Sequence, residues 1–212
     1  MMYNFKPLIF SLLALSSSLI CPSYFVAQSV DDYEAKVISQ RMDKESELLS
    51  ENHSPLSKAN RKALQPLQFF EVNDRWKLPA AFVLNSLPDT LAIPTSNGAT
   101  KKFERYGFFV FDHALLKDTL YAYKRIYPAS SMPKHEPYLF LPFTDLTTGE
   151  ESYGGGRYID VAIPEDGQDV IIDFNDCYNP YCAYGSGFSC PIPPKENFLG
   201  QYIQAGERKL ID

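Results

Sequence analysis

From Leu67 onward, hydrophobic and polar residues form short runs that are separated by turn-forming residues. Runs of this kind, rich in aromatic and β-branched residues and bounded by Asn, Asp, Gly and Pro, are typical of β-strands. Short strands at close spacing, with no long helix between them, predict a mainly β protein built as an antiparallel β-sandwich or barrel. We expect strands at residues 67–72, 76–84, 90–94, 103–111, 119–126, 138–143, 157–163, 170–174 and 202–210.

One turn in this region has the composition of a hairpin turn. Residues 164–167 read Pro-Glu-Asp-Gly, and Asp-Gly is well suited to a tight reversal. We therefore expect the flanking strands, 157–163 and 170–174, to form a hairpin.

The region before the strands has a helical pattern. Residues 31–50 predict a helix that Asp31 can cap, with Glu34 three residues later completing a capping-box-like pair. Its apolar stripe is narrow, so we expect this helix to lie across the outside of the sheet. Ser57 is placed to cap a second, short helix that ends near Leu64. The chain is therefore expected to comprise a helical arm at residues 28–64 and a β body at residues 65–212.

The first 27 residues have the composition of a secretory signal peptide. Lys6 precedes an apolar run at residues 7–15 and a Ser-rich stretch, and we expect cleavage after Ala27. The run is short and interrupted by serines, which argues against a membrane span. Lipoprotein processing at Cys21 is a rival, although Ile20 stands where a small residue is expected. An uncleaved N-terminal anchor is a second rival. The favoured expectation is an exported protein, periplasmic or extracellular, with no transmembrane span in the mature chain.

Charge and composition limit the partners. The formal net charge is -6 and no block of Lys or Arg stands out, so we expect no nucleic-acid partner. The 14 Tyr and 15 Phe favour half-buried pleated surfaces. We identify no cofactor motif: the glycines at 154–156 lack the Lys-Ser/Thr ending of a phosphate-binding P-loop and predict a tight turn or bulge.

The cysteines favour one disulfide. After cleavage at Ala27 three remain, and Cys182 and Cys190 are separated by seven residues in a loop-rich stretch. Export favours a bridge between these two, while a pair of reduced buried thiols and a metal site are the alternatives. The histidines lack the spacing of metal ligands, so no metal site is expected.

The C-terminal third contains long, ordered motifs. They read Pro142-Phe-Thr-Asp-Leu-Thr-Thr-Gly149, Ser152-Tyr-Gly-Gly-Gly-Arg-Tyr-Ile-Asp160, Asp173-Phe-Asn175, Tyr178-Asn-Pro-Tyr-Cys-Ala-Tyr184, Cys190-Pro-Ile-Pro-Pro194, Glu196-Asn197 and Ala205-Gly-Glu207. Together with upstream segments, they make residues 33–209 resemble the bacterial and archaeal family catalogued as domain of unknown function 1684. The resemblance implies no established activity. Cys177 departs from it, since a small residue such as Ala is expected there, which makes Cys177 the expected unpaired thiol.

Two arginines in these segments could bind an anion. Arg105 and Arg157 carry planar guanidinium groups that suit a carboxylate or phosphate. The alternative for Arg157 is an internal ion pair with Asp145 or Asp173. Tyrosines 153, 158, 178, 181 and 184 could line a pocket, although several should pack in the core. The candidate ligand-binding residues are Arg105, Asp145, Tyr153, Arg157, Asp173, Asn175, Asn179 and Glu207.

Three functions remain open. The favoured one is a module that binds a small polar or anionic ligand near Arg157, Tyr153 and the loop 173–197. The second is a structural or partner-binding envelope protein. The third is a hydrolase that uses Asp145, Asp173 or Glu207 as acid or base, so the sequence leaves open whether the protein is an enzyme.

Overall fold

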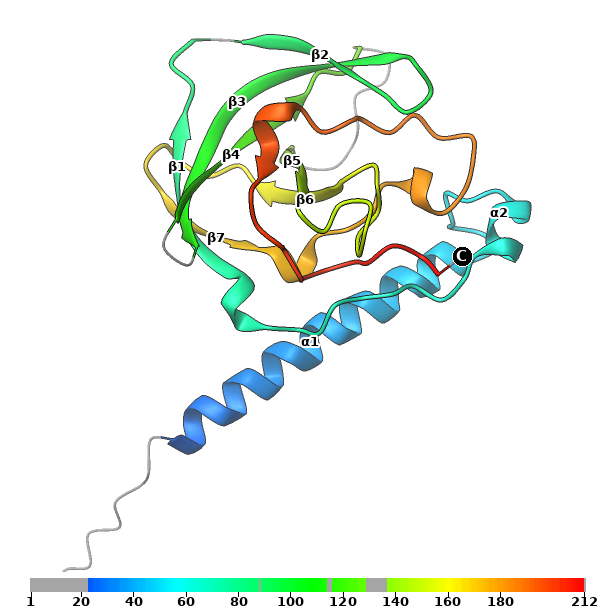
Figure 1. Cartoon of the computed structure of the whole chain (residues 1–212), viewed down its shortest axis with the longest axis horizontal. Coiled ribbons are helices and arrows are strands. Elements are labelled where there is room, and N and C mark those ends of the chain that lie inside the picture. The colour runs from blue at the N-terminus through cyan, green and yellow to red at the C-terminus, as the bar shows by residue number, and fades with distance from the viewer. Residues whose placement is uncertain (1–22, 88, 114–115, 129–136, 212) are drawn as a thin grey trace, which may run out of the picture.

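The computed structural model describes residues 23–87, 89–113, 116–128 and 137–211 (Figure 1). Most of the expected signal peptide, including Cys21, lies outside these residues. The helices are α1 (Ser23–Leu49) and α2 (Lys58–Ala63). The strands are β1 (Lys77–Leu84), β2 (Thr90–Pro94), β3 (Thr100–His113), β4 (Leu116–Arg125), β5 (Tyr138–Asp145), β6 (Arg157–Ala162), β7 (Asp169–Asp173) and β8 (Phe198–Leu199).

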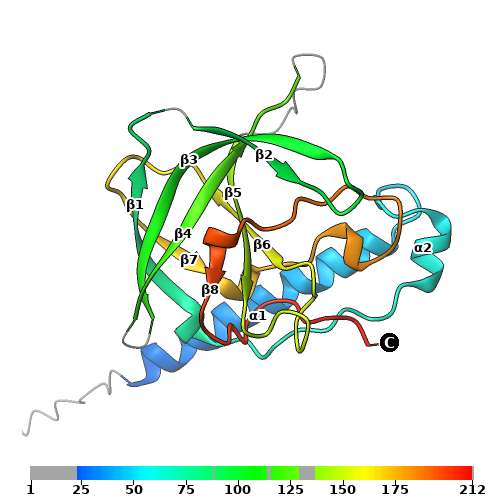
Figure 2. The ribbon, with the colours of Figure 1, turned by 45° about the horizontal axis from the view of Figure 1, so that its top comes forward.

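The strands form one strongly curled sheet, a half-barrel, which Figures 1 and 2 show from two directions. The strand order is β6-β5-β4-β3-β1-β7, and all these pairings are antiparallel. Strand β2 pairs with the first part of β3, and the short β8 adds a parallel pairing to β5. The prediction of a mainly β, antiparallel fold with an N-terminal helical arm is confirmed, in its barrel-like form.

Strand β5 is buried on both faces because it separates two hydrophobic clusters. Leu139, Leu141 and Phe143 point into the barrel core, which also contains Phe109 and Phe174. On the other face, Phe140 packs in an aromatic cluster whose buried members are Ile93, Phe103, Tyr123, Phe140 and Tyr158. The Phe140 ring lies 5.5 Å from Phe103 and 4.6 Å from Tyr158, centroid to centroid. Each fully buried side chain of this size contributes about 1.5–3 kcal/mol to folding, so both faces of β5 stabilise the body.

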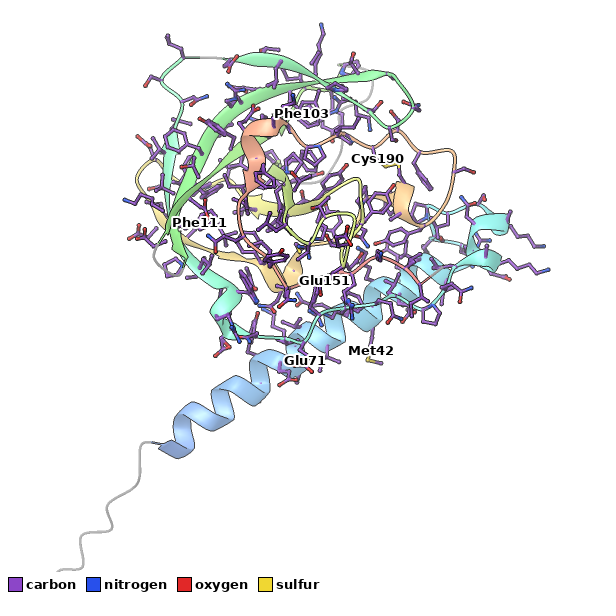
Figure 3. All side chains as sticks on the ribbon, viewed as in Figure 1. Met42, Glu71, Phe103, Phe111, Glu151 and Cys190 are labelled. Atoms are coloured by element: carbon purple, nitrogen blue, oxygen red, sulfur yellow. A yellow bond between two sulfur atoms is a disulfide. The ribbon has the colours of Figure 1, made fainter. Side chains whose placement is uncertain are left out.

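Helix α1 lies along the outside of the body, as expected from its narrow apolar stripe (Figure 1). Val37 and Leu48 are buried, while Met42 is exposed and labelled on α1 in Figure 3. Arg41 donates a hydrogen bond to the carbonyl of Phe70 at 2.9 Å. The helix begins at Ser23, so the expected cap at Asp31 is wrong: no Gly or Pro interrupts residues 23–30, and the helix continues through them.

The short second helix has the expected cap. Ser57 is the N-cap of α2, and its side chain accepts a hydrogen bond from the backbone N–H of Asn60. In the described part of the chain, no helix is both long and apolar enough to cross a bilayer.

Two expected strands are absent. Residues 67–72 and 202–210 run side by side but share only the isolated bridge Phe69–Glu207 and scattered backbone hydrogen bonds, including Phe70 N to Gly206 O at 2.9 Å. Gly206 has a φ of +68°, which interrupts the extended backbone that a longer ladder needs.

The expected hairpin is also wrong. Strands β6 and β7 do not pair with each other and lie at opposite ends of the strand order. The turn at 164–167 instead contacts β1: Gly167 N donates to Phe82 O, and Asp166 accepts from Leu84 N. The turn therefore connects the two ends of the curled sheet, and its composition fits this role as well as a hairpin.

Candidate ligand-binding pocket

Arg157 lies in the interior and forms the internal ion pair with Asp145. Its Nη2 atom donates to Asp145 Oδ2 at 2.6 Å, and to the carbonyl of Ile203 at 2.8 Å. Its Nη1 atom donates to the carbonyls of Ala205 and Glu207. Arg157 thereby attaches the C-terminal segment to the sheet, and its hydrogen bonds are directed to the protein itself.

The other candidate acids have internal partners as well. Asp173 accepts hydrogen bonds from the Tyr33 hydroxyl at 2.6 Å and from Asn175. The carboxylate of Glu207 pairs with Lys44 and accepts from Tyr184 and from Asn179 N. Asp145, Asp173 and Glu207 each accept hydrogen bonds from different residues, and none of these contacts joins two of the three carboxylates. Their arrangement therefore gives no support to a hydrolase that uses two of them as an acid–base pair.

The remaining candidates lie at or near the surface or in loops. Arg105 forms ion pairs with Asp89 at 2.9 Å and Glu196 at 2.6 Å. Tyr153 is partly buried, and its ring lies against the position that a Cβ on Gly155 would occupy. Asn175 exchanges hydrogen bonds with the backbone of Asn73.

The glycine-rich segment is a tight turn, as predicted. Gly156 has a φ of +80°, and a Cβ there would lie 2.6 Å from Phe143 O. The turn places Arg157 at the start of β6, directly opposite Phe143 on β5.

A pocket of about 860 Å³ lies on the aromatic-cluster face of the sheet. Its floor comes from β3 to β6, and it is covered by residues 176–191, which we call the covering loop, and by the end of α1. We call it the aromatic pocket, since its walls include Phe103, Tyr138, Phe140, Tyr158, Tyr178 and Tyr181. In Figure 3, Phe103 and Cys190 lie on the same side of the body, away from α1. Of the eight candidate ligand-binding residues, Asn179 lines this pocket.

Sequence reasoning missed all four cations that line the pocket, Lys44, Lys101, Lys124 and Arg125. Lys101 on β3 and Arg125 on β4 are partly buried, and Arg125 pairs in register with Phe103, whose ring lies 5.0 Å from the guanidinium carbon. Lys101 donates to Ser189 O, and Arg125 donates to Lys102 O at 3.0 Å. Among the described residues, neither makes an ion pair with a carboxylate.

Burial lowers the pKa of both Lys101 and Arg125. For Lys101, the neighbouring charge of Arg125 lowers the pKa further, as expected for two like charges close together. The sequence shows that Lys101 and Phe103 alternate with Lys102, as residues on the same face of a strand do. Only the register between β3 and β4 shows that Arg125 lies opposite Phe103.

Carboxylates line the pocket on the side of β6 and α1. Asp160 accepts a hydrogen bond from the Tyr178 hydroxyl at 2.7 Å, and Glu47 and Asp176 also contribute to the lining. Burial, followed by the charge of Asp160, raises the pKa of Tyr178 well above its ordinary value. Tyr178 is therefore a neutral donor at physiological pH.

The covering loop is crosslinked by the expected disulfide between Cys182 and Cys190. Cys190 lines the pocket and forms backbone and side-chain hydrogen bonds with Ser96, in the turn between β2 and β3. Cys177 is a free, buried thiol, as expected, and burial raises its pKa to about 11. Within the described ranges, no three His, Cys, Asp or Glu side chains are grouped so that they could hold a metal ion.

The fold and the pocket define a small curled-sheet protein with a ligand-sized pocket on one face of its sheet. The model of the family described as protein of unknown function (DUF1684) matches residues 62–208, and the chain belongs to this family. The solution NMR structure of an uncharacterised protein from Haloarcula marismortui is similar, with 30% sequence identity and a TM-score of 0.63. The match covers 85% of this chain and 96% of that one. No curated protein matches the chain.

Proposed function

We propose that this protein is a binding module for a small anionic ligand with an apolar, ring-sized body, and that the ligand occupies the aromatic pocket. The observation that carries the proposal is the pair Lys101 and Arg125. Two adjacent, partly buried cations have no carboxylate partner among the described residues. Their mutual repulsion is relieved when an anion binds between them.

The chemistry of the two side chains suits a carboxylate or a phosphate. A guanidinium group presents parallel N–H donors to two oxygens of such an anion, while an ammonium group adds a point charge. Because both groups are partly shielded from water, the attraction is stronger than at an open surface. The anion-binding role that the sequence suggested for Arg157 is thereby assigned to Lys101 and Arg125, since Arg157 is paired with Asp145.

The walls suit the apolar part of the ligand. Pockets for small molecules commonly enclose about 300–1,000 Å³ and are lined mainly by apolar and aromatic side chains with a few polar groups. The aromatic pocket has about 860 Å³ and such a lining. Tyrosine rings such as those of Tyr158 and Tyr181 offer flat apolar faces for a ring to stack against.

We also propose that the protein acts outside the cytoplasm, in the periplasm or the extracellular space. The N-terminal sequence supports export, and the disulfide between Cys182 and Cys190 is of a kind that persists in oxidising compartments. Fractionation of cells that express the full chain, with N-terminal sequencing of the product, tests this. Recovery of uncleaved protein in the cytoplasm contradicts export.

Thermal unfolding with a panel of anions tests the binding function. The panel contains inorganic phosphate, benzoate, 4-ethylbenzoate and phenyl phosphate, each beside a neutral analogue where one exists. A ligand at 100 times its dissociation constant stabilises the native state by about 2.7 kcal/mol, so we expect aromatic anions to raise the melting temperature and neutral analogues to have little effect. A panel without any stabilising anion contradicts the proposal.

A control that removes a positive charge outside the pocket makes the test specific. Lys101→Gln combined with Arg125→Gln should abolish the shift. Lys102→Gln should preserve it, because Lys102 is exposed on the opposite face of β3 and its carbonyl, which Arg125 contacts, is retained. Equal binding by the double variant and the control contradicts the assignment of the site.

A further inference from the structure

The charges that line the aromatic pocket are separated in space. Of the four cations in the lining, Lys101, Lys124 and Arg125 come from β3 and β4, and Lys44 comes from α1. The carboxylates of Asp160, Glu47 and Asp176 come from β6, α1 and the start of the covering loop. Because Lys44 is paired with Glu207, a ligand that fills the pocket meets a net positive charge at the β3–β4 end and a net negative charge at the β6–α1 end.

A buried acceptor belongs to the pocket lining. Asn179 is 2% exposed and lines the pocket, yet its side-chain oxygen has no hydrogen-bond donor among the described residues. The orientation of the amide is fixed, because Nδ2 donates to Arg208 O at 2.8 Å. Buried polar atoms are normally paired, so this acceptor is unusual among the polar groups that line the pocket.

Aromatic rings accompany the acidic side. Tyr178 donates to Asp160, and Tyr138 and Tyr181 also line the pocket. Burial, followed by the charge of Asp160, raises the pKa of Tyr138 to about 12. Burial, followed by the charges of Glu47 and Asp160, raises the pKa of Tyr181. These tyrosines therefore stay neutral and offer ring faces, which attract ammonium groups. One of the rings already contacts a cation, since Lys44 Nζ lies 4.7 Å from the Tyr178 centroid.

The strand register sets the separation of the two ends. Tyr123 on β4 pairs with Phe140 on β5, which pairs with Asp160 on β6, and Arg125 lies two residues beyond Tyr123. Two strand spacings and two residues of rise give about 12 Å between the Cα atoms of Arg125 and Asp160 in a flat sheet. Both residues line the pocket, so a single ligand that contacts both has to reach across two strand spacings.

From this arrangement we infer that the ligand is zwitterionic, with a carboxylate or phosphate at Lys101 and Arg125 and an ammonium group beside Asp160, on opposite ends of a ring-sized body. The inference rests on the proposed binding function and adds the chemical class of the ligand. The acidic end contributes charge attraction from Asp160 and Glu47, and ring faces from Tyr138 and Tyr181. An anion that lacks the ammonium group forgoes these contacts.

Calorimetry with three matched probes tests the inference on the folded protein. The zwitterion is 4-(aminomethyl)benzoate, the anion of similar shape is 4-ethylbenzoate, and the cation is 4-methylbenzylamine. We expect the zwitterion to bind at least about tenfold more tightly than either single-charge probe, because the cation–aromatic and carboxylate contacts add to the anion contact.

Variants connect the preference to the acidic end. Asp160→Asn should remove the preference for the zwitterion and leave the affinity for 4-ethylbenzoate within about twofold. Glu47→Gln, a change at an exposed position of α1, should reduce the preference without disturbing the fold. Asp169→Asn, at an exposed position on β7 outside the pocket, is the control and should change neither affinity.

The outcomes separate the two proposals. Binding of 4-ethylbenzoate as tightly as the zwitterion, or a preference that survives both Asp160→Asn and Glu47→Gln, overturns the zwitterion and leaves the anion-binding function standing. If neither probe binds, the zwitterion is again overturned. The proposed anion-binding function is contradicted as well only if no anion of the thermal-unfolding panel stabilises the protein.

Discussion

Arg157 and Asp145 form an ion pair that is shielded from solvent, with 2.6 Å between Nη2 and Oδ2 and side-chain exposures of 1% and 0%. The same guanidinium group binds the carbonyls of Ile203, Ala205 and Glu207. One side chain therefore connects β6, the end of β5 and the C-terminal segment. Such a charge is tolerated in the interior only because each of these partners is present.

Replacing Arg157 with Met should therefore destabilise the protein strongly. The change leaves a buried carboxylate without its cation, and loss of one partner of a buried pair costs about 3–5 kcal/mol. Urea unfolding followed by the fluorescence of the buried Trp76 measures the free energy of unfolding. Arg105→Met is the control, since its pairs are partly exposed and should be worth about 0–1 kcal/mol. Similar losses in both variants contradict a special role for Arg157.

The disulfide between Cys182 and Cys190 should affect both the free energy of unfolding and the number of thiols that can be titrated. Replacing Cys182 and Cys190 together with Ser should lower the free energy of unfolding by about 2.5 kcal/mol, as the chain-entropy relation gives for a loop this short. In denatured, unreduced protein that has lost its leader, one thiol should titrate, that of Cys177. In the native state at pH 8 this thiol should react slowly, because it is buried with a pKa of about 11. Three reactive thiols before reduction refute the bridge.

Gly156 and Gly98 form a matched pair for testing the tight turn before β6. Both have φ near +80°, so Ala costs about 1–2 kcal/mol of backbone strain at either position. At Gly156, the added methyl group would also meet Phe143 O and the Pro193 ring, whereas Gly98 has nothing within 4 Å. We expect overpacking to lower the free energy of unfolding of Gly156→Ala by about 1–3 kcal/mol more than that of Gly98→Ala. Equal melting temperatures for the two variants would show that the turn tolerates the methyl group.

Anion binding should weaken as the pH rises. The pKa of Lys101 lies below its ordinary value of 10.5 in the free protein, and a bound anion favours the charged form and raises it. Binding is then linked to proton uptake wherever Lys101 is partly deprotonated, so affinity falls as the pH rises through the pKa of the free protein. Dissociation constants for 4-ethylbenzoate between pH 7 and 10 measure this trend. Lys101→Gln should flatten it, and an unchanged slope in that variant would exclude Lys101 as the titrating group.

Much of the sheet was predictable, because alternation and turn residues mark individual strands. Strand β2 has the expected bounds, and β1 and β3 to β7 differ from expectation by a few residues at most ends. Pairing was not predictable from the same signals: the turn at 164–167 suits a hairpin but connects β6 to the far edge of the sheet. Residues 67–72 have a strand pattern because Leu67 and Phe70 are buried, although no continuous ladder forms there.

The pocket was only partly predictable. The covering loop and three of the expected tyrosines, Tyr158, Tyr178 and Tyr181, do line it. Lys101 and Arg125 were missed because charged residues on strands usually face solvent, and only the register between β3 and β4 shows that they meet beside an aromatic ring. Conversely, Arg157 lies among conspicuous glycines and tyrosines, yet its environment is determined by the distant segment 203–207.

Strand β5 has a consequence for how the family can diversify. Positions 139, 141 and 143 are committed to the barrel core, whereas Tyr138 and Phe140 form part of the pocket. A substitution at Tyr138 or Phe140 therefore changes the pocket wall, whereas one at an odd-numbered position changes the barrel core. Under the proposed binding function, relatives that share this sheet can differ in ligand through exchanges at these two wall positions, with the barrel core unchanged.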